Sequence, residues 1–326
     1  MQISTSILIC RLAGLCLIAV STVVAAQTFP SRPITLIVPF AAGGPTDTIS
    51  RNVAQKMAET LGQPVLVDNR PGAGGQIAGN IVKQARADGY TLFVGATEMF
   101  AINQTLFKKF SYDPLKDFVP IAAFFETPMV LVVSKESPVN SVQELVALAR
   151  TKAGGLSYAS QGLGSVGHLL GSSLSKMSAV NLTHVPYKGS APALQDLATG
   201  QVDMMFDVVA SSGPLIAGGK LKALAVASPK SFASLPGIPT LSEGGVTGLD
   251  ASVWFGVVAP AGTPADVVEV LNNAITTAVS NPELVKRFGA LGMRPLLLTH
   301  RSFTAFMKSE SERWTPIVKA SGAEVD

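Results

Sequence analysis

The sequence from Ile34 to Arg51, ITLIVPFAAGGPTDTISR, contains a strand, a glycine turn and the start of a helix. Ile34–Val38 is apolar and rich in β-branched residues, which favours a strand buried on both faces. The pair Gly43-Gly44 ends that strand, and Pro45 and Asp47 are residue types favoured in the first turn of a helix. Such a turn points free backbone N–H groups beyond the strand end. The sequence therefore predicts an anion-binding site there.

A second stretch repeats this arrangement later in the chain. Gly162-Leu-Gly-Ser-Val-Gly167 follows the predicted strand Leu156–Ala159 and precedes the predicted helix His168–Met177. Its spacing matches the G-x-G-x-x-G of dinucleotide-binding loops, yet no acidic residue ends the next strand, where such a site binds the ribose. Three interpretations stay open: a nicotinamide site, a glycine turn that permits close helix–strand packing, and an anion site without a nucleotide.

The first 26 residues have the pattern of a secretory signal peptide. Arg11 is their only charged residue, an apolar run follows it, and Val24-Ala25-Ala26 places small residues before a cleavage site at Gln27. We therefore expect an exported protein, with an uncleaved membrane anchor as the alternative. Cys10 and Cys16 are the two cysteines of the chain and both lie in this segment, so we expect a mature chain without disulfides.

The composition is that of a globular protein. The chain has 326 residues and a formal net charge of +3, with 47% hydrophobic and 14% charged residues. Its Lys and Arg residues are scattered along the sequence, which argues against a nucleic-acid-binding surface. About 300 residues follow the predicted signal peptide, enough for two lobes of ordinary size.

Repeated strand–helix units predict an α/β fold with two lobes, each a mostly parallel sheet flanked by helices. We expect residues 27–125 to form the first part of lobe 1 and residues 126–226 to form lobe 2. Residues 227–326 are expected to return to lobe 1 and to form the C-terminal helices. The apolar segment Phe118–Val133 is interrupted by Pro120 and Pro128, so we expect a connector between the lobes rather than one strand. Ligands of such sheets bind at the carboxyl ends of the strands.

Three polar residues near predicted strand ends each have two interpretations. Asp47 either stabilises its own helix and turn, which we favour, or faces the ligand. His168 either hydrogen-bonds at the helix start or contacts the ligand. Asp207 either caps the turn after its strand, which we favour, or binds an ammonium or hydroxyl group. The three histidines lack metal-site spacing and no catalytic motif is present, so we expect no metal, no cofactor and no catalysis.

The mature chain resembles the Bug family, the periplasmic solute-binding proteins of tripartite tricarboxylate transporters. The resemblance covers nearly all of the mature chain, and it lies in the order and spacing of several short motifs. These are GGPTD (43–47) with Arg51, NRPGAGG (69–75), DGYT (88–91), SQGLGS (160–165) with His168, PYKGS (186–190), GQVD (200–203) and the segment 254–264.

The resemblance implies a two-lobed clamshell, monomeric, that closes on a small organic carboxylate. It presents this ligand to the permease subunits of a tripartite transporter or, alternatively, to a sensor. A secreted oxidoreductase with a nicotinamide at Gly162–Gly167 is the alternative from another class. In the family, one glycine loop per lobe holds the carboxylate through backbone N–H groups and waters, and these loops correspond to Ala42–Asp47 and Gly162–Val166. With Thr97, Tyr187 and Asp207 added by location, the expected ligand-binding residues are Phe40, Ala42, Gly43, Gly44, Thr46, Asp47, Thr97, Ser160, Gly162, Leu163, Gly164, Ser165, Val166, His168, Tyr187 and Asp207.

Overall fold

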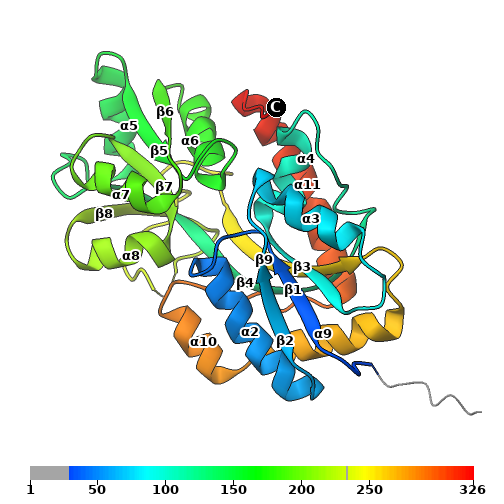
Figure 1. Ribbon diagram of the computed structural model, residues 1–326. Coiled ribbons are helices and arrows are strands. Elements are labelled where there is room, and N and C mark those ends of the chain that lie inside the picture. The colour runs from blue at the N-terminus through cyan, green and yellow to red at the C-terminus, as the bar shows by residue number, and fades with distance from the viewer. Residues whose placement is uncertain (1–28, 233) are drawn as a thin grey trace, which may run out of the picture.

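The computed structural model describes residues 29–232 and 234–326. The expected signal peptide and its cleavage site therefore lie outside the described residues. Two α/β lobes lie side by side, as expected, and Figure 1 shows the second lobe in green beside the first. In the part of the chain that the structure describes, no helix is long and apolar enough to cross a membrane.

The sheet of lobe 1 has a parallel centre extended by antiparallel strands. β1 (Ile34–Val38) lies between β2 (Val65–Asn69) and β3 (Thr91–Ala96), and these three strands are parallel. β9 (Ser252–Pro260) pairs antiparallel with β3, although β3 ends at Ala96 and β9 begins only at Ser252.

 The register places Gly95 opposite Gly256 and Ala96 opposite Phe255. The short strand β10 (Arg294–Pro295) lies at the edge, beside the long strand β4 (Phe118–Ser134).

β4 corrects one expectation from the sequence. Phe118–Val133 is not a connector, because it lies within a single strand that passes from one lobe into the other. Up to Pro128 the strand pairs with β9, and from Met129 onward it pairs with strands of lobe 2. The strand tolerates Pro120 because the ladder with β9 shifts its register just after that residue, and Pro128 lies where the pairing partner changes.

The sheet of lobe 2 is built around this second half of β4. β5 (Leu156–Ser160) is parallel to both β6 (Leu182–Pro186) and β7 (Met204–Val208), while β7 and β8 (Leu221–Ala227) flank β4 in antiparallel orientation. β7 begins two residues later than the predicted strand Val202–Phe206, which places Asp207 inside the strand rather than just after it.

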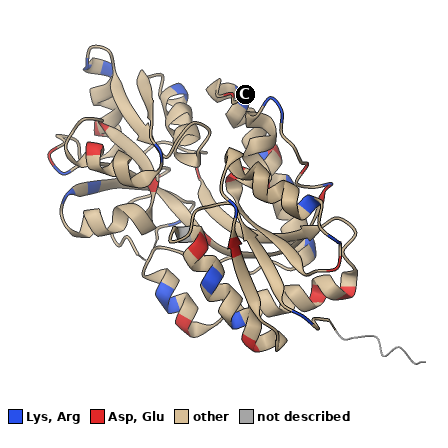
Figure 2. Ribbon diagram, in the orientation of Figure 1, with Lys and Arg blue, Asp and Glu red and all other residues tan. Residues whose placement is uncertain are grey.

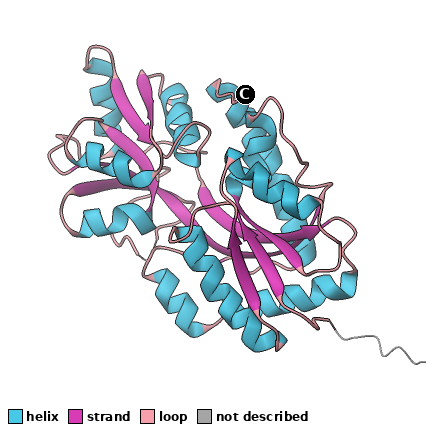
Figure 3. Cartoon of the chain, in the orientation of Figure 1, coloured by secondary structure: helices cyan, strands magenta, loops and turns pink. Residues whose placement is uncertain are grey.

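Helices flank the sheets of both lobes, as Figure 3 shows. Lobe 1 contains α2 (Pro45–Leu61), α3 (Gln76–Lys83), α4 (Asn103–Leu106), α9 (Ala265–Val279), α10 (Pro282–Gly289) and α11 (His300–Ser321), with the short helical turns η1 (Ala73–Gly75) and η2 (Glu98–Ile102). Lobe 2 contains α5 (Val142–Thr151), α6 (Val166–Met177), α7 (Ser190–Ala198) and α8 (Val209–Ala217).

A buried carboxylate anchors the C-terminal helix α11 to strand β9. The Glu310 carboxylate accepts hydrogen bonds from the indole N–H of Trp254 at 2.9 Å and of Trp314 at 3.2 Å. Arg313 donates to the same carboxylate at 2.8 Å. Since Trp254 lies between Val253 and Phe255 on β9, this anchor fixes a strand whose neighbouring residues face the space between the lobes.

Replacing Glu310 by alanine tests this anchor. The substitution leaves two buried indole N–H groups without an acceptor, and each such group costs about 1–3 kcal/mol, so we expect the free energy of unfolding to fall by about 2–6 kcal/mol. Urea denaturation measures the change. Glu312→Ala, on the exposed side of the same helix, is the matched control and should change stability by less than about 0.5 kcal/mol. Equal losses in the two variants would contradict the anchoring role.

Candidate functional site

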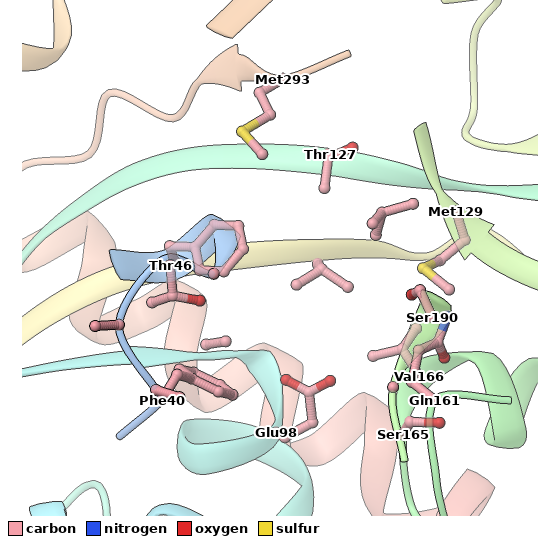
Figure 4. A pocket seen from close by; sticks show the side chains of 18 residues that line it. Phe40, Thr46, Glu98, Thr127, Met129, Gln161, Ser165, Val166, Ser190 and Met293 are labelled. Atoms are coloured by element: carbon pink, nitrogen blue, oxygen red, sulfur yellow. The ribbon is translucent and has the colours of Figure 1, made fainter. Parts of the chain in front are cut away.

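A cavity of about 550 Å³ lies between the lobes and is lined by 18 residues. Figure 4 shows Phe40 and Thr46 on one side, Gln161, Ser165, Val166 and Ser190 on the opposite side, and Glu98 between them. Of the residues expected from the sequence, those that line the cavity are Phe40, Ala42, Gly44, Thr46, Ser165 and Val166. Both glycine turns, which are far apart in the sequence, therefore meet at one cavity.

The turn between β1 and α2 is held by the Asp47 carboxylate. This buried group accepts hydrogen bonds from the Gly43 N–H at 2.9 Å, from Arg51 Nε at 3.0 Å and from Asn69 Nδ2 at 2.9 Å. Burial alone raises the pKa of Asp47, but the bonds from Arg51, Gly43 and Asn69 outweigh it and lower the pKa to about 2. Asp47 therefore stays charged at neutral pH and holds the turn from behind, outside the cavity lining.

This arrangement determines which N–H groups of the first turn remain available. The Gly43 N–H donates to Asp47, and Pro45 has no N–H to donate. Among the hydrogen bonds of the described residues, none uses the N–H of Gly44 or Thr46, and both residues line the cavity. The positive end of α2 thus presents unpaired donors to the cavity.

The turn between β5 and α6 is held by side chains that lie behind it. The Gly162 N–H donates to Ser160 Oγ at 3.1 Å, and the Gly164 N–H donates to His168 Nδ1 at 3.1 Å. Ser165 Oγ accepts from the His168 N–H at 3.3 Å, which caps α6. His168 thus forms hydrogen bonds at the helix start and does not line the cavity.

The bond from Gly164 requires a neutral His168 ring. Burial, followed by the adjacent His184 ring, lowers the pKa of His168 to about 4. The two rings stack with their centroids 3.9 Å apart, and Ser160 Oγ lies 2.7 Å from His184 Nε2. The second turn therefore keeps its geometry at neutral pH, where Nδ1 of His168 can accept a hydrogen bond.

Asp207 lies behind the lobe 2 side of the cavity. Its fully buried carboxylate accepts hydrogen bonds from Ser190 Oγ at 2.6 Å, Gln161 Nε2 at 2.8 Å and Ser211 Oγ at 2.5 Å. Burial raises the pKa of Asp207 above its ordinary value, although the three donors act in the opposite direction. Asp207 therefore positions Gln161 and Ser190, which do line the cavity, and through Ser211 it also contacts the start of α8, whereas it does not itself line the cavity.

The remaining expected residues also lie outside the cavity lining. Thr97 is buried and its Oγ1 accepts the Trp254 N–H at 2.9 Å, which ties the end of β3 to β9. The Tyr187 hydroxyl donates to Asp196 at 2.6 Å. Leu163 is exposed, and Gly164 has a positive φ of 77° with Leu106 of α4 directly against it. A Cβ on Gly164 would lie 2.0 Å from Leu106, so this turn packs closely against lobe 1.

Sequence reasoning missed most of the apolar wall and one acidic residue. The missed lining residues are Ala41, Ala96, Glu98, Thr127, Met129, Gln161, Gly189, Ser190, Val208, Val253, Phe255 and Met293. Glu98 follows β3 at the same rim as the first turn, so its position after a strand end was available from the sequence. The lining residues on β4 and β9 are brought to the cavity by pairing between strands that are distant along the chain. The sequence pattern of a single segment does not predict such pairing.

Glu98 is the one acidic residue among those that line the cavity, and burial raises its pKa. Lys, Arg, Asp and Glu are spread over both lobes in Figure 2, without a face of one sign in this view. Residues 29–232 and 234–326 contain no group of His, Cys, Asp and Glu side chains suited to a metal ion. No Lys, Arg or His is among the residues that line the cavity, so its lining offers backbone N–H groups rather than cationic side chains to an anion.

Replacing Asp47 by asparagine tests how the first turn is held. We expect the free energy of unfolding to fall by about 1–3 kcal/mol at neutral pH, because a charged acceptor of three hydrogen bonds is removed. Since the pKa of Asp47 is lowered to about 2, the folded protein binds fewer protons than the unfolded chain between about pH 4 and pH 2. The stability that the charged Asp47 contributes is therefore lost as the pH falls through this range. Urea denaturation across this range should show a weaker acid dependence in Asp47→Asn than in the unmodified protein.

Asp68→Asn is the matched control for this variant. Asp68 lies on the neighbouring strand β2 and pairs at 3.0 Å with Arg70 on the surface, so we expect a change below about 0.5 kcal/mol. An Asp47→Asn protein with the stability and acid dependence of Asp68→Asn would contradict the role assigned to Asp47.

Comparison with known proteins identifies the family. Residues 49–323 match the sequence model of a protein family described as the tripartite tricarboxylate transporter family receptor. A UPF0065 protein from the tcbD-tcbE intergenic region of Pseudomonas sp. is 40% identical over 311 residues, which cover 94% of this chain and 92% of that protein.

Two solved structures extend the similarity to the fold. Rpa4515 of R. palustris, solved with adipate, has a TM-score of 0.82 and 36% identity, and the match covers 91% of this chain and 100% of that chain. The periplasmic binding protein BugD has a TM-score of 0.79 and 36% identity, with 91% and 99% of the two chains covered. The resemblance to the Bug family is thus confirmed, and the chain belongs to the tripartite tricarboxylate transporter receptor family.

Proposed function

We propose that the protein is a periplasmic solute-binding receptor that captures a small organic carboxylate between its lobes. As a monomer, it presents this ligand to the membrane subunits of a tripartite transporter and catalyses no reaction. One observation carries the proposal: the turns that start α2 and α6, one from each lobe, line the same cavity. Helix starts of this kind favour negatively charged groups, because their first N–H groups are unpaired and the helix dipole is positive there.

The energetics favour a ligand held by both lobes. A micromolar ligand requires about 8 kcal/mol of binding free energy, whereas one hydrogen bond to a charged group contributes about 1.5–3 kcal/mol. Contacts from one turn alone are therefore insufficient. Binding that needs both turns favours the arrangement in which the lobes are close together, and a membrane partner then recognises that arrangement.

We also propose that the lobes are divided near residues 126 and 227, with the hinge in the crossing segments. β4 changes its pairing partner between Pro128 and Met129, which supports the first boundary. The chain runs from β8 back to β9 through residues 228–251, where Thr240 forms an isolated bridge with Val226 of β8, which supports the second boundary. A hinge made of a few such positions absorbs the change in backbone angles when lobes open or close.

The similar proteins support the ligand class and the compartment. Rpa4515 was solved with adipate, and BugD is described as a periplasmic binding protein. The nicotinamide alternative has less support from the second turn. A Cβ on Gly167 would lie 2.6 Å from the Phe206 carbonyl oxygen, so close helix–strand packing accounts for this glycine, and β6 ends at Pro186 without an acidic residue for a ribose.

Gly44→Val tests the binding role of the first turn. Gly44 has φ −76°, which valine adopts, and a Cβ there meets only the Ala41 carbonyl oxygen at 3.6 Å. The side chain would project toward the cavity and block the approach to the first-turn N–H groups, so we expect at least a roughly hundredfold loss of affinity, about 2.7 kcal/mol, with the fold retained. Calorimetry with straight-chain mono- and dicarboxylates of three to eight carbons measures it.

Gly289→Val, on α10 and away from the cavity, is the matched control, because nothing lies within 4 Å of a Cβ at that position. We expect this variant to bind as the unmodified protein does. In thermal-shift measurements, a ligand at 100 times its Kd adds about 2.7 kcal/mol of stability. A folded protein that none of these acids stabilises, or a Gly44→Val variant with full affinity, would contradict the proposed function.

A further inference from the structure

One wall of the cavity is the surface of two paired strands. Val253 and Phe255 of β9 both line the cavity, as expected for residues two apart on a strand, which face the same side of a sheet. β4 contributes Thr127 and Met129, and Thr127 pairs directly with Val253. Three of these four side chains have neither nitrogen nor oxygen, so this wall offers a ligand an almost entirely apolar surface.

The apolar surface continues around the cavity. Figure 4 shows Met293 and Thr127 on the side opposite Glu98. Met129 and Met293 are buried, with exposed fractions of 1% and 4%, and their flexible side chains can adapt to the shape of an apolar group. Ten of the 18 lining residues have side chains without nitrogen or oxygen: Phe40, Ala41, Ala42, Ala96, Met129, Val166, Val208, Val253, Phe255 and Met293.

Three of the six polar side chains that line the cavity donate their protons within the protein. The Gln161 amide donates to Asp207 at 2.8 Å and to the Phe206 carbonyl oxygen at 3.0 Å. The Ser190 hydroxyl donates to Asp207 at 2.6 Å, and the Ser165 hydroxyl donates to the carbonyl oxygen three residues before it at 2.8 Å. A ligand hydroxyl therefore finds no free donor in these three side chains.

The polar side chains that remain in the lining are those of Thr46, Thr127 and Glu98. Together with the N–H groups at the helix starts, they suit the carboxylate of a ligand and one or two further polar groups. They are too few for hydroxyl groups along a whole carbon chain. Each hydroxyl that leaves water for the apolar wall without a hydrogen-bond partner weakens binding.

We propose that the cavity selects carboxylates whose remaining part is an unsubstituted hydrocarbon and excludes polyhydroxylated acids. This inference rests on the proposed function, since it names the ligand class within it. It applies to acids with one carboxylate or two, because the starts of α2, α6 and α7 all line the cavity. The carboxylate binds at a helix start, and the hydrocarbon part lies against Met129, Val253, Phe255 and Met293.

Two matched pairs of acids test this selectivity. Hexanoate and gluconate have one carboxylate each, adipate and galactarate have two, and within each six-carbon pair only the second acid carries hydroxyl groups on its chain. We expect calorimetry at pH 7 to give at least about hundredfold tighter binding of the hydrocarbon acid in both pairs. From butyrate to hexanoate, affinity should rise about fourfold for each methylene, because each one is removed from water.

Substitutions in the apolar wall test its role. Met293→Gln keeps the length of the side chain and places an amide on the wall, so we expect the ratio of hexanoate to gluconate affinity to fall at least tenfold. Val253→Thr keeps the shape of the side chain and adds a hydroxyl, and it should lower the same ratio at least threefold if Met293→Gln does not fold. Met177→Gln, on α6 with an exposed fraction of 52%, is the control and should leave the ratio unchanged.

The outcomes separate this inference from the proposed function. A hydroxylated acid that binds as tightly as the hydrocarbon acid of its pair overturns the inference alone, since a carboxylate is still bound. An unchanged ratio of affinities in folded Met293→Gln and Val253→Thr proteins also overturns it. Failure of all four acids to bind the folded protein overturns the proposed function and the inference together.

Discussion

The cavity depends on two helices that begin with unpaired backbone N–H groups. In α2, Pro45 contributes no N–H and the Gly43 N–H is bonded to Asp47, so the donors of Gly44 and Thr46 remain. In α6, Ser165 caps the third N–H, and Val166, the first residue of the helix, lines the cavity. A buried donor without a partner is costly, so these helix starts are stable only where water or a ligand can reach them.

Buried side chains keep both turns in position. Asp47, His168 and Asp207 each accept hydrogen bonds from the turns or from residues that line the cavity, and none of the three lines it. Their protonation states suit this work, since Asp47 is charged and His168 is neutral at pH 7. Side chains therefore shape the site from behind, while the backbone forms the surface that a ligand meets.

Much of the fold was predictable from local patterns. Ile34–Val38 and Leu221–Ala227 form strands with the expected bounds, and both glycine turns are followed by the expected helices, because turn residues and apolar periodicity act over a few positions. β4 was not predictable in this way. Its two prolines indicate an interruption, and only the register shift and the change of pairing partner in three dimensions explain why the strand continues.

The same limit applies to the site. Six lining residues in and beside the two glycine turns were identified from the sequence, although Ala41 and Gln161 were missed. Met129, Val253 and Phe255 reach the cavity through pairing between strands that are distant along the chain. Asp47 lies in the first turn of α2 and Thr97 directly after β3, as expected, but the direction of each side chain depends on neighbours such as Asn69 and Trp254. Position along the chain was available from the sequence, and orientation was not.

Amide chemical shifts test the central claim most directly, because they report on the backbone N–H groups themselves. During titration of the isotopically labelled protein with hexanoate, the account predicts that the amide protons of Gly44 and Thr46 show the largest downfield shifts, as expected for donors that gain a charged acceptor. Saturable binding that leaves these two amides unchanged would contradict the account.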